Sequence, residues 1–290
     1  MKSPTAIQLF FCPLNTDLLD ESTASIVRSW LPEDEVKKVD RFIQQSSRDQ
    51  GLMVRGYLRS VLSRFASVEP QQWQFEYGEK GKPRLTAEQF AETGLQFNLS
   101  HSGDWLLIGV ANTYGTAQQH TEIELGVDIE RRRETTNIHS ILNHYFSKPE
   151  ESALLALTED KHRERFFDLW ALKESYIKAK GLGLALSLKS FAFDLSAASL
   201  GELQVNDETI TIQQGVPLSL LKASDSDGLL EDFVIAPQWH CYLGKLDDLY
   251  RFAVSIGGAS SFLDELPPEL KAKKISWLEV VNHAFKPTDR

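Results

Sequence analysis

One nine-residue segment, 122–130, places the strongest constraint on how this chain folds. Its sequence, EIELGVDIE, alternates between polar or glycine positions and branched apolar residues. Successive side chains of a β-strand point to opposite faces of a sheet, so one face of this strand is apolar and packs on a core. Asp128 and Glu130 share the opposite face, side by side at the end of the strand.

These paired carboxylates admit two interpretations. In the first, the strand is half-exposed and its polar face is solvated. In the second, the neighbouring carboxylates repel each other and need a cation to hold them together. A cluster of oxygen ligands favours Mg²⁺ or Ca²⁺ over zinc. The pattern alone leaves both interpretations open.

A helix is predicted over 164–180, and it carries an acidic residue on its apolar side. At 100° per residue, Phe166, Trp170 and Ile177 form one stripe, and Glu174 falls inside it. Glu174 also stands four residues before Lys178, the spacing of an ordinary exposed ion pair worth about 0.2–0.5 kcal/mol. A carboxylate on an apolar face instead needs a cation, a metal or a proton, because burying it bare is very costly.

Length and composition narrow the class of protein. The 290 residues correspond to about two domains of roughly 150 residues. A formal charge of −10 argues against nucleic acid as a partner, because proteins that bind nucleic acids contact the phosphates with positively charged side chains. Cys12 and Cys241 have neither disulfide nor zinc-site spacing, which favours a cytoplasmic protein. We expect no membrane partner, since no apolar stretch of 18 residues occurs.

Periodicity predicts several further elements. A strand is expected over 7–12, a helix over 47–66 and a hairpin over 97–111. The segment 218–232, rich in Ser and Asp, is expected to be an inserted loop. Apolar residues between 277 and 285 predict an amphipathic helix near the end of the chain.

Five motifs, taken together, resemble those of the 4'-phosphopantetheinyl transferases of the Sfp type, in the holo-acyl-carrier-protein synthase superfamily. The family hallmarks G-[I/V]-D-[I/V]-E and W-x-x-K-E-[S/A]-x-x-K correspond to residues 126–130 and 170–178. Three other segments are similar to further family motifs, namely GKP at 81–83, FNLSHS at 97–102 and FSKPE at 146–150. The motifs occur in the family order within about residues 30–195, so their joint chance occurrence is small.

The fold that the resemblance implies is α+β, with two similar halves related by a pseudo-twofold axis and coenzyme A bound between them. We expect an N-terminal half over 1–120, a C-terminal half with the metal and catalytic residues over 121–258, and a C-terminal extension over 259–290. The polar stretch 112–121 is the expected link. An internal pseudo-dimer of this kind predicts a monomer.

The activity that the resemblance implies is Mg²⁺-dependent transfer of the 4'-phosphopantetheine group of coenzyme A to a serine of an apo acyl or peptidyl carrier protein, with release of 3',5'-ADP. Asp128, Glu130 and Glu174 would hold the metal. Glu174 would activate the carrier serine, and Lys178 would neutralise or protonate the leaving phosphate. The residues implied to act in catalysis are Glu174, Lys178, Asp128 and His101.

The resemblance also implies a set of contacts to coenzyme A. Lys82, Ser100 and His101 match family positions that contact its phosphates and adenine region. Many relatives have an arginine in the second helix where alignment places Gln50 here, so Arg48 and Arg55 are nominated in its place. The full set is Lys38, Arg48, Arg55, Lys82, Pro83, Ser100, His101 and Lys178.

Three consecutive arginines, Arg131, Arg132 and Arg133, follow the expected metal carboxylates. Carrier proteins of this kind are acidic around the modified serine, so we expect these arginines to steer the partner. The alternative is a solvated run of charge beside a strand end. Two other functions also stay open: a catalytically silent module that binds coenzyme A or a carrier protein, and a Mg²⁺-dependent phosphohydrolase.

Overall fold

The structure is a computed structural model that describes residues 6–113, 123–222, 232–258 and 267–282. The helices are α1 (Glu21–Ser29), α2 (Glu33–Asp40), α3 (Gln45–Leu62), α4 (Ala87–Thr93), α5 (Ile138–Tyr145), α6 (Lys148–Leu155), α7 (Glu159–Lys180) and α8 (Trp277–Asn282). Short 3₁₀ turns are η1 (Thr16–Leu18), η2 (Pro70–Gln72), η3 (Gly183–Ala185) and η4 (Leu188–Ser190). The strands are β1 (Ala6–Pro13), β2 (Phe75–Tyr77), β3 (Pro83–Leu85), β4 (Leu95–Ser102), β5 (Trp105–Asn112), β6 (Glu124–Arg131), β7 (Phe191–Phe193), β8 (Ser199–Val205), β9 (Glu208–Gln214), β10 (Leu218–Leu221), β11 (Phe233–Ile235), β12 (His240–Lys245), β13 (Tyr250–Gly257) and β14 (Glu269–Lys274).

Nine of the described strands form one sheet, in the order β4-β5-β1-β14-β8-β9-β12-β13-β6. β14 pairs parallel with β1 and β8, and the other neighbours are antiparallel. The sheet curls until its two edge strands, β4 and β6, come into contact. The pairings of the described strands include no backbone ladder between these two, and side chains join them instead. We call this junction the seam.

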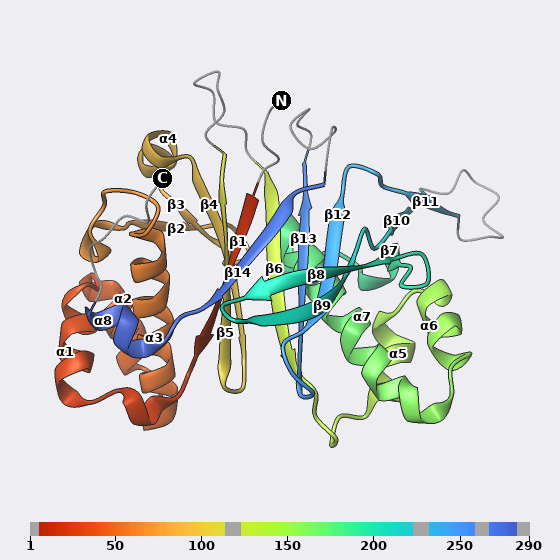
Figure 1. Cartoon of the computed structure of the whole chain (residues 1–290), viewed down its shortest axis with the longest axis horizontal. Helices are drawn as coiled ribbons and strands as arrows, with labels where there is room; N and C mark the ends of the chain where they lie inside the picture. The colour runs from red at the N-terminus through yellow and green to blue at the C-terminus, as the bar shows by residue number, and fades with distance from the viewer. Residues whose placement is uncertain (1–5, 114–122, 223–231, 259–266, 283–290) are drawn as a thin grey trace.

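Helices cover two separate parts of the outer surface of the curled sheet (Figure 1). Helices α1, α3 and α8 pack on the strands β1, β4 and β5, and helices α5–α7 pack near β12 and β13. Apolar side chains on the inner faces of the strands form a third cluster, which includes Leu9, Leu107, Val127, Phe252 and Val254. The apolar face of β6 therefore lies inside the sheet, and its polar face is left for α7 and the seam.

Helix α7 approaches strand β6 very closely because residue 126 is glycine. A Cβ atom at this position would lie 1.9 Å from the carbonyl oxygen of Ser175 and 2.3 Å from the nitrogen of Ala179. Any side chain there would push the helix away from the strand. The glycine of the first hallmark motif thus allows the second motif to pack directly on it.

A buried ion pair holds the side of α7 that faces away from β6. Nζ of Lys173 lies 2.7 Å from Oε2 of Glu150, and both side chains are fully buried. Lys173 also donates to the carbonyl oxygens of Leu188 and Phe191, at 2.7 and 3.0 Å. Burial lowers the pKa of Lys173, and the Glu150 carboxylate opposes this effect. The additional hydrogen bonds are what a buried charge requires to be stable.

The structure confirms the α+β class and the two-part arrangement of the elements. The predicted strand 7–12 lies within β1, the predicted helix 47–66 overlaps α3, and the predicted hairpin 97–111 is formed by β4 and β5. The helix predicted from 164 begins earlier, since α7 starts at Glu159.

Segment 218–232 is not entirely a loop. Residues 218–221 form β10, because buried Leu218 pairs with Phe193 of β7 and joins the second helical core. Residues 223–231 lie outside the described part of the chain, as do 114–122, which include most of the expected link.

The region near the end of the chain is integrated into the fold. β14 lies inside the sheet, and α8 buries Trp277 and Val280 against α1 and α3. The helix predicted over 277–285 is therefore present as far as Asn282, and residues 283–290 lie outside the described ranges. In those ranges, no helix combines the length and hydropathy needed to cross a membrane.

Candidate active site

Alternate residues of β4 hydrogen-bond to β6 across the seam. The side-chain oxygen of Asn98 accepts the N–H of Val127 at 2.9 Å. Two residues further, the hydroxyl of Ser100 donates to Oδ1 of Asp128 at 2.8 Å. The pairs advance in the same direction on both strands, so β4 and β6 run parallel here.

Ser102 forms the last contact of the seam. Its hydroxyl donates to Oε2 of Glu130 at 3.3 Å and accepts the N–H of Arg131 at 3.1 Å. The FNLSHS segment therefore contacts both carboxylates of the GVDIE segment through hydroxyl groups.

Asp128 has two very different carboxylate oxygens. Oδ1 accepts Nζ of Lys178 at 2.5 Å in addition to Ser100, and the same ammonium lies 2.6 Å from Oγ of Ser100. Oδ2 is buried and has no hydrogen-bond partner in the described part of the protein. Since a buried carboxylate oxygen rarely stays without a partner, this oxygen indicates a missing ligand.

Glu130 and Glu174 complete a cluster of three carboxylates. Burial raises the pKa of Glu130 to about 7, and the charges of Asp128 and then Glu174 contribute in the same direction, while Lys178 opposes them. Burial also raises the pKa of Glu174, followed by the charge of Asp128, and Lys178 again opposes. Lys178 acts on all three carboxylates, and in the described part of the protein their negative charge exceeds the positive charge of this ammonium.

The residues fit a divalent cation bound by oxygen ligands, because the cluster combines a partnerless buried oxygen with mutually repelling carboxylates. Among the described residues, no group of three or more acidic, His or Cys side chains is already arranged to hold an ion. Shared ligation by Asp128, Glu130 and Glu174 therefore requires rotation of at least one side chain.

His101 lies on β4 between the two seam serines. Desolvation by the surrounding protein lowers the pKa of His101, and the Lys178 ammonium contributes in the same direction. The side chain of His101 is exposed and, by the alternation of the strand, lies on the opposite face of β4 from the two serines.

Lys82 ends the turn between β2 and β3, and Pro83 is the first residue of β3. Nζ of Lys82 donates to the carbonyl oxygens of Leu125 on β6 and Ala179 on α7, at 3.0 and 2.8 Å. Lys82 thus links this turn to the backbone of β6 and of α7, the two elements that carry the hallmark segments. Pro83 pairs with Tyr77 in the same hairpin.

The other three predicted basic residues belong to α2 and α3 and have local partners. Lys38 pairs with Asp34 at 3.0 Å and lies 4.7 Å above the ring of Tyr77, against the hairpin that carries Lys82. Arg48 donates to the carbonyl oxygen of Phe42 at 2.9 Å. Arg55 donates to the carbonyl of Gly51 at 2.8 Å and lies 3.6 Å from buried Glu35. None of these contacts reaches the carboxylate cluster.

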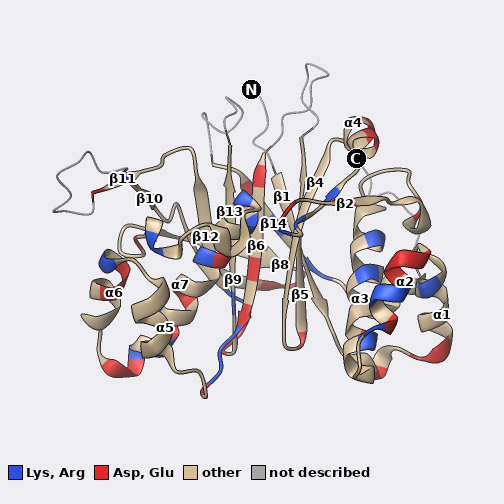
Figure 2. Cartoon of the chain, turned by 180° about the vertical axis from the view of Figure 1, so that it is seen from behind, with Lys and Arg blue, Asp and Glu red and all other residues tan. Residues whose placement is uncertain are grey.

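The three arginines after the carboxylates form a basic segment that leaves β6 toward α5 (Figure 2). Arg131 lies 3.7 Å from Asp104, and Nε of Arg132 lies 3.5 Å from Glu134. Arg133 is exposed, and its carbonyl accepts Arg163 at 2.8 Å. Neighbouring acids therefore offset part of this charge.

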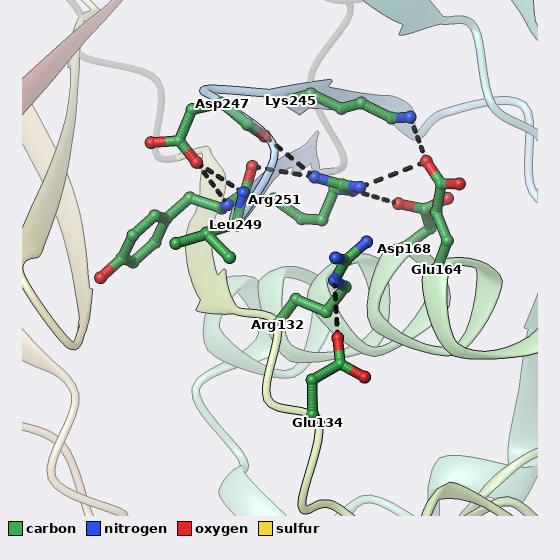
Figure 3. Close-up of polar contacts among 9 residues, drawn as sticks. Arg132, Glu134, Glu164, Asp168, Lys245, Asp247, Leu249 and Arg251 are labelled. Carbon is green, nitrogen blue, oxygen red and sulfur yellow. Dashed lines mark hydrogen bonds and ion pairs between the residues drawn. The ribbon is translucent and has the colours of Figure 1, made fainter.

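A charged network beside this segment joins α7 to β12 and β13 (Figure 3). Buried Arg251 donates to Asp168 at 3.0 Å and to Glu164 at 3.2 Å, and Lys245 also pairs with Glu164. Burial raises the pKa of Asp168 to about 6, although Arg251 opposes this effect. The network anchors the first half of the helix that carries Glu174.

Two seam residues, Asn98 and Ser102, were not predicted from the sequence to have a role in the site. The signal that could have found them is the period-two alternation of Asn98, Ser100 and Ser102, which places all three on one face of a strand. The sequence does not show that β4 contacts β6, so the polar pattern alone predicts a solvent-exposed face.

Two family models match different parts of the chain. One, described as the 4'-phosphopantetheinyl transferase superfamily, matches residues 124–236 and contains both hallmark segments. Another, described as 4'-phosphopantetheinyl transferase, N-terminal, matches residues 20–113.

Individual proteins with the same activity in their names are also similar. The 4'-phosphopantetheinyl transferase HetI of a Nostoc species is 34% identical over 184 residues, which cover 63% of this chain and 73% of that protein. The 4'-phosphopantetheinyl transferase Sfp of Bacillus subtilis is 32% identical over 167 residues, covering 58% of this chain and 67% of Sfp. The L-aminoadipate-semialdehyde dehydrogenase-phosphopantetheinyl transferase of Mus musculus is 26% identical over 196 residues, covering 65% of this chain and 60% of that enzyme. Together with the family models, these similarities show that the chain belongs to the 4'-phosphopantetheinyl transferase family.

Proposed function

We propose that this transferase moves the 4'-phosphopantetheine group of coenzyme A to a serine hydroxyl of an apo acyl or peptidyl carrier protein. The Oγ–P bond forms at the β-phosphorus, the P–O bond to 3',5'-ADP breaks, and the serine proton leaves. The observation that carries this proposal is the meeting of Asp128, Glu130, Glu174 and Lys178 at one seam. Family membership supports coenzyme A as the substrate.

The carboxylate cluster supports a role for Mg²⁺. Asp128, Glu130 and Glu174 would hold it, consistent with the partnerless Oδ2 of Asp128. The ion would supply positive charge to the pyrophosphate of coenzyme A.

Acid–base roles follow from the charges of the residues. Glu174, whose pKa is raised by burial, would accept the serine proton directly or through water. Lys178 would neutralise or protonate the leaving phosphate. Its ammonium, held by Ser100 and Asp128, puts a positive charge beside the cluster.

The contacts to coenzyme A are proposed from the family resemblance. Lys82, Pro83, Ser100 and His101 would contact its phosphates and adenine region, and Lys178 would complete this group. Lys38, which lies against the hairpin of Lys82, would join them, together with Arg48 or Arg55 from α3.

We propose halves over 1–120 and 121–258, with a C-terminal extension over 259–290 whose described residues form β14 and α8 and pack into the body of the fold. Separate family models for 20–113 and 124–236 support the boundary between the halves. A monomer agrees with two halves in one chain. A cytoplasmic location agrees with the buried free thiols of Cys12 and Cys241.

The proposed reaction predicts that consumption of coenzyme A depends on a carrier. Incubation with coenzyme A, Mg²⁺ and an apo carrier protein should release 3',5'-ADP in proportion to the carrier modified, as measured by chromatography. Without the carrier, release should fall to background. Equal release without a carrier would instead support a phosphohydrolase that uses water.

The basic segment after β6 predicts salt-dependent recognition of an acidic carrier. Replacing Arg131, Arg132 and Arg133 together with Ala should lower kcat/KM for the carrier by about tenfold at low salt, and the difference should shrink at high salt. A control with the same change of charge, Lys189→Ala/Lys271→Ala/Lys273→Ala, removes exposed lysines from other elements. An unchanged rate for the arginine variant at low salt would remove the steering role.

A further inference from the structure

Side-chain hydrogen bonds join β4 to β6 at the seam, and the Ser102 hydroxyl makes two of them. A hydroxyl both donates and accepts, and Ser102 uses both capacities on neighbouring groups of β6. It donates to Oε2 of Glu130 at 3.3 Å and accepts the N–H of Arg131 at 3.1 Å. The residue is only 9% exposed, so water does not readily replace these partners.

The turn that carries Ser102 is itself anchored. Gly103 has a left-handed φ of 56°, and a Cβ there would lie 2.5 Å from the hydroxyl of Tyr250. That hydroxyl accepts the N–H of Asp104 at 2.9 Å and lies 3.0 Å from its Oδ2. Because Tyr250 belongs to β13, the neighbour of β6, Ser102 is held against β6 from two directions.

Glu130 needs such a partner because its surroundings repel it. Asp128 and Glu174 act on it with like charge, and Lys178 opposes them. In the described part of the protein, Ser102 donates a hydrogen bond to its carboxylate. The Ser102 hydroxyl donates to Oε2 of Glu130 and does not bind Oε1. The bond to the Arg131 N–H ties the hydroxyl to the backbone, so the position of Oε2 follows the backbone of β6.

We propose that Ser102 is a positioning residue that sets the direction of the Glu130 carboxylate for cation binding. This inference rests on the proposed metal role of Glu130. Ser102 is better suited to a test than Ser100, because Ser100 also contacts Lys178 and is itself proposed to bind coenzyme A.

The test compares Ser102→Ala with Ser102→Thr, which keeps the hydroxyl, and with a matched control. Ser63→Ala is that control, because Ser63 is also 9% exposed and its hydroxyl accepts Nε1 of Trp73 at 2.9 Å, in the N-terminal helical layer. Binding of Mn²⁺ in the presence of coenzyme A is measured by electron paramagnetic resonance of free Mn²⁺, with a blank of coenzyme A alone. Thermal unfolding of each variant reports its stability.

Ser102→Ala should weaken Mn²⁺ binding by about tenfold or more, as loss of a group that orients a ligand commonly does. Ser102→Thr should restore most of the affinity. Ser63→Ala should lose comparable thermal stability but bind Mn²⁺ like the wild type. The Mg²⁺ concentration for half-maximal rate should rise in step with the Mn²⁺ dissociation constant.

Unchanged Mn²⁺ affinity in folded Ser102→Ala would overturn the proposal, as would equal weakening in Ser63→Ala. The titration contains no carrier protein. If the wild type transferred nothing to any carrier while Ser102→Ala still weakened Mn²⁺ binding, the proposed reaction would fail and the positioning role would stand.

Discussion

Glu174→Gln is expected to lower the rate of carrier modification by about a hundredfold to ten-thousandfold, the range associated with loss of a positioned general base. The amide has nearly the same shape but cannot accept the serine proton as a carboxylate does. It also removes one negative charge from the cluster of Asp128, Glu130 and Glu174. The rate is measured under single-turnover conditions with saturating coenzyme A, so that product release does not hide the chemical step.

A matched control is Glu159→Gln, the same substitution at the exposed start of the same helix. It should retain the wild-type rate. Raising Mg²⁺ tenfold distinguishes two roles of Glu174. If the rate recovers, the main role of Glu174 is metal binding. If the rate stays low, Glu174 acts in proton transfer. A Glu174→Gln variant as fast as the wild type at the original Mg²⁺ concentration would contradict both roles.

Lys173→Met is expected to lower the free energy of unfolding by about 3–5 kcal/mol, because it leaves the carboxylate of Glu150 buried without its cation. Both side chains are fully buried at a separation of 2.7 Å. Lys173 also satisfies the carbonyl oxygens of Leu188 and Phe191, which would lose a donor. The measurement is urea unfolding followed by circular dichroism.

Two further variants sharpen the stability test. Lys148→Met breaks the Lys148–Glu151 pair on α6, whose lysine is 75% exposed, and should cost less than about 1 kcal/mol. Adding Glu150→Leu to Lys173→Met should recover part of the loss, since an apolar pair can replace a buried ion pair. A loss below about 1 kcal/mol for Lys173→Met alone would mean that the pair does not hold α7 in place.

Local patterns predicted the carboxylate strand and the acidic helix correctly. The period of two along 122–130 separates Asp128 from the apolar residues, and the structure places that residue at the seam with its neighbours Val127 and Ile129 in the core. The period of a helix puts Glu174 on a half-buried face. These predictions succeed because each depends on the geometry of one element.

Features that depend on contacts between elements distant in the chain were not predicted from the sequence. The ELKAKK segment of β14 looks polar, yet it lies inside the sheet between β1 and β8. Its place could not be predicted from the local pattern, because both partner strands are remote in the chain. The contact of Ser102 with Glu130 requires the sheet to curl until its edges meet. Likewise, Lys173 reads as an exposed helix residue until α6 brings Glu150 to it.

This chain is expected to transfer phosphopantetheine to a carrier protein with Glu174 at the reacting serine. The most direct measurement is the intact mass of an apo carrier protein after incubation with the chain, coenzyme A and Mg²⁺, in parallel with the Glu174→Gln variant. A mass gain of one phosphopantetheine group is expected with the wild type, and the variant should lose it. Bound coenzyme A without any mass gain, across acyl and peptidyl carriers, would contradict the transfer reaction and point to a silent binding module.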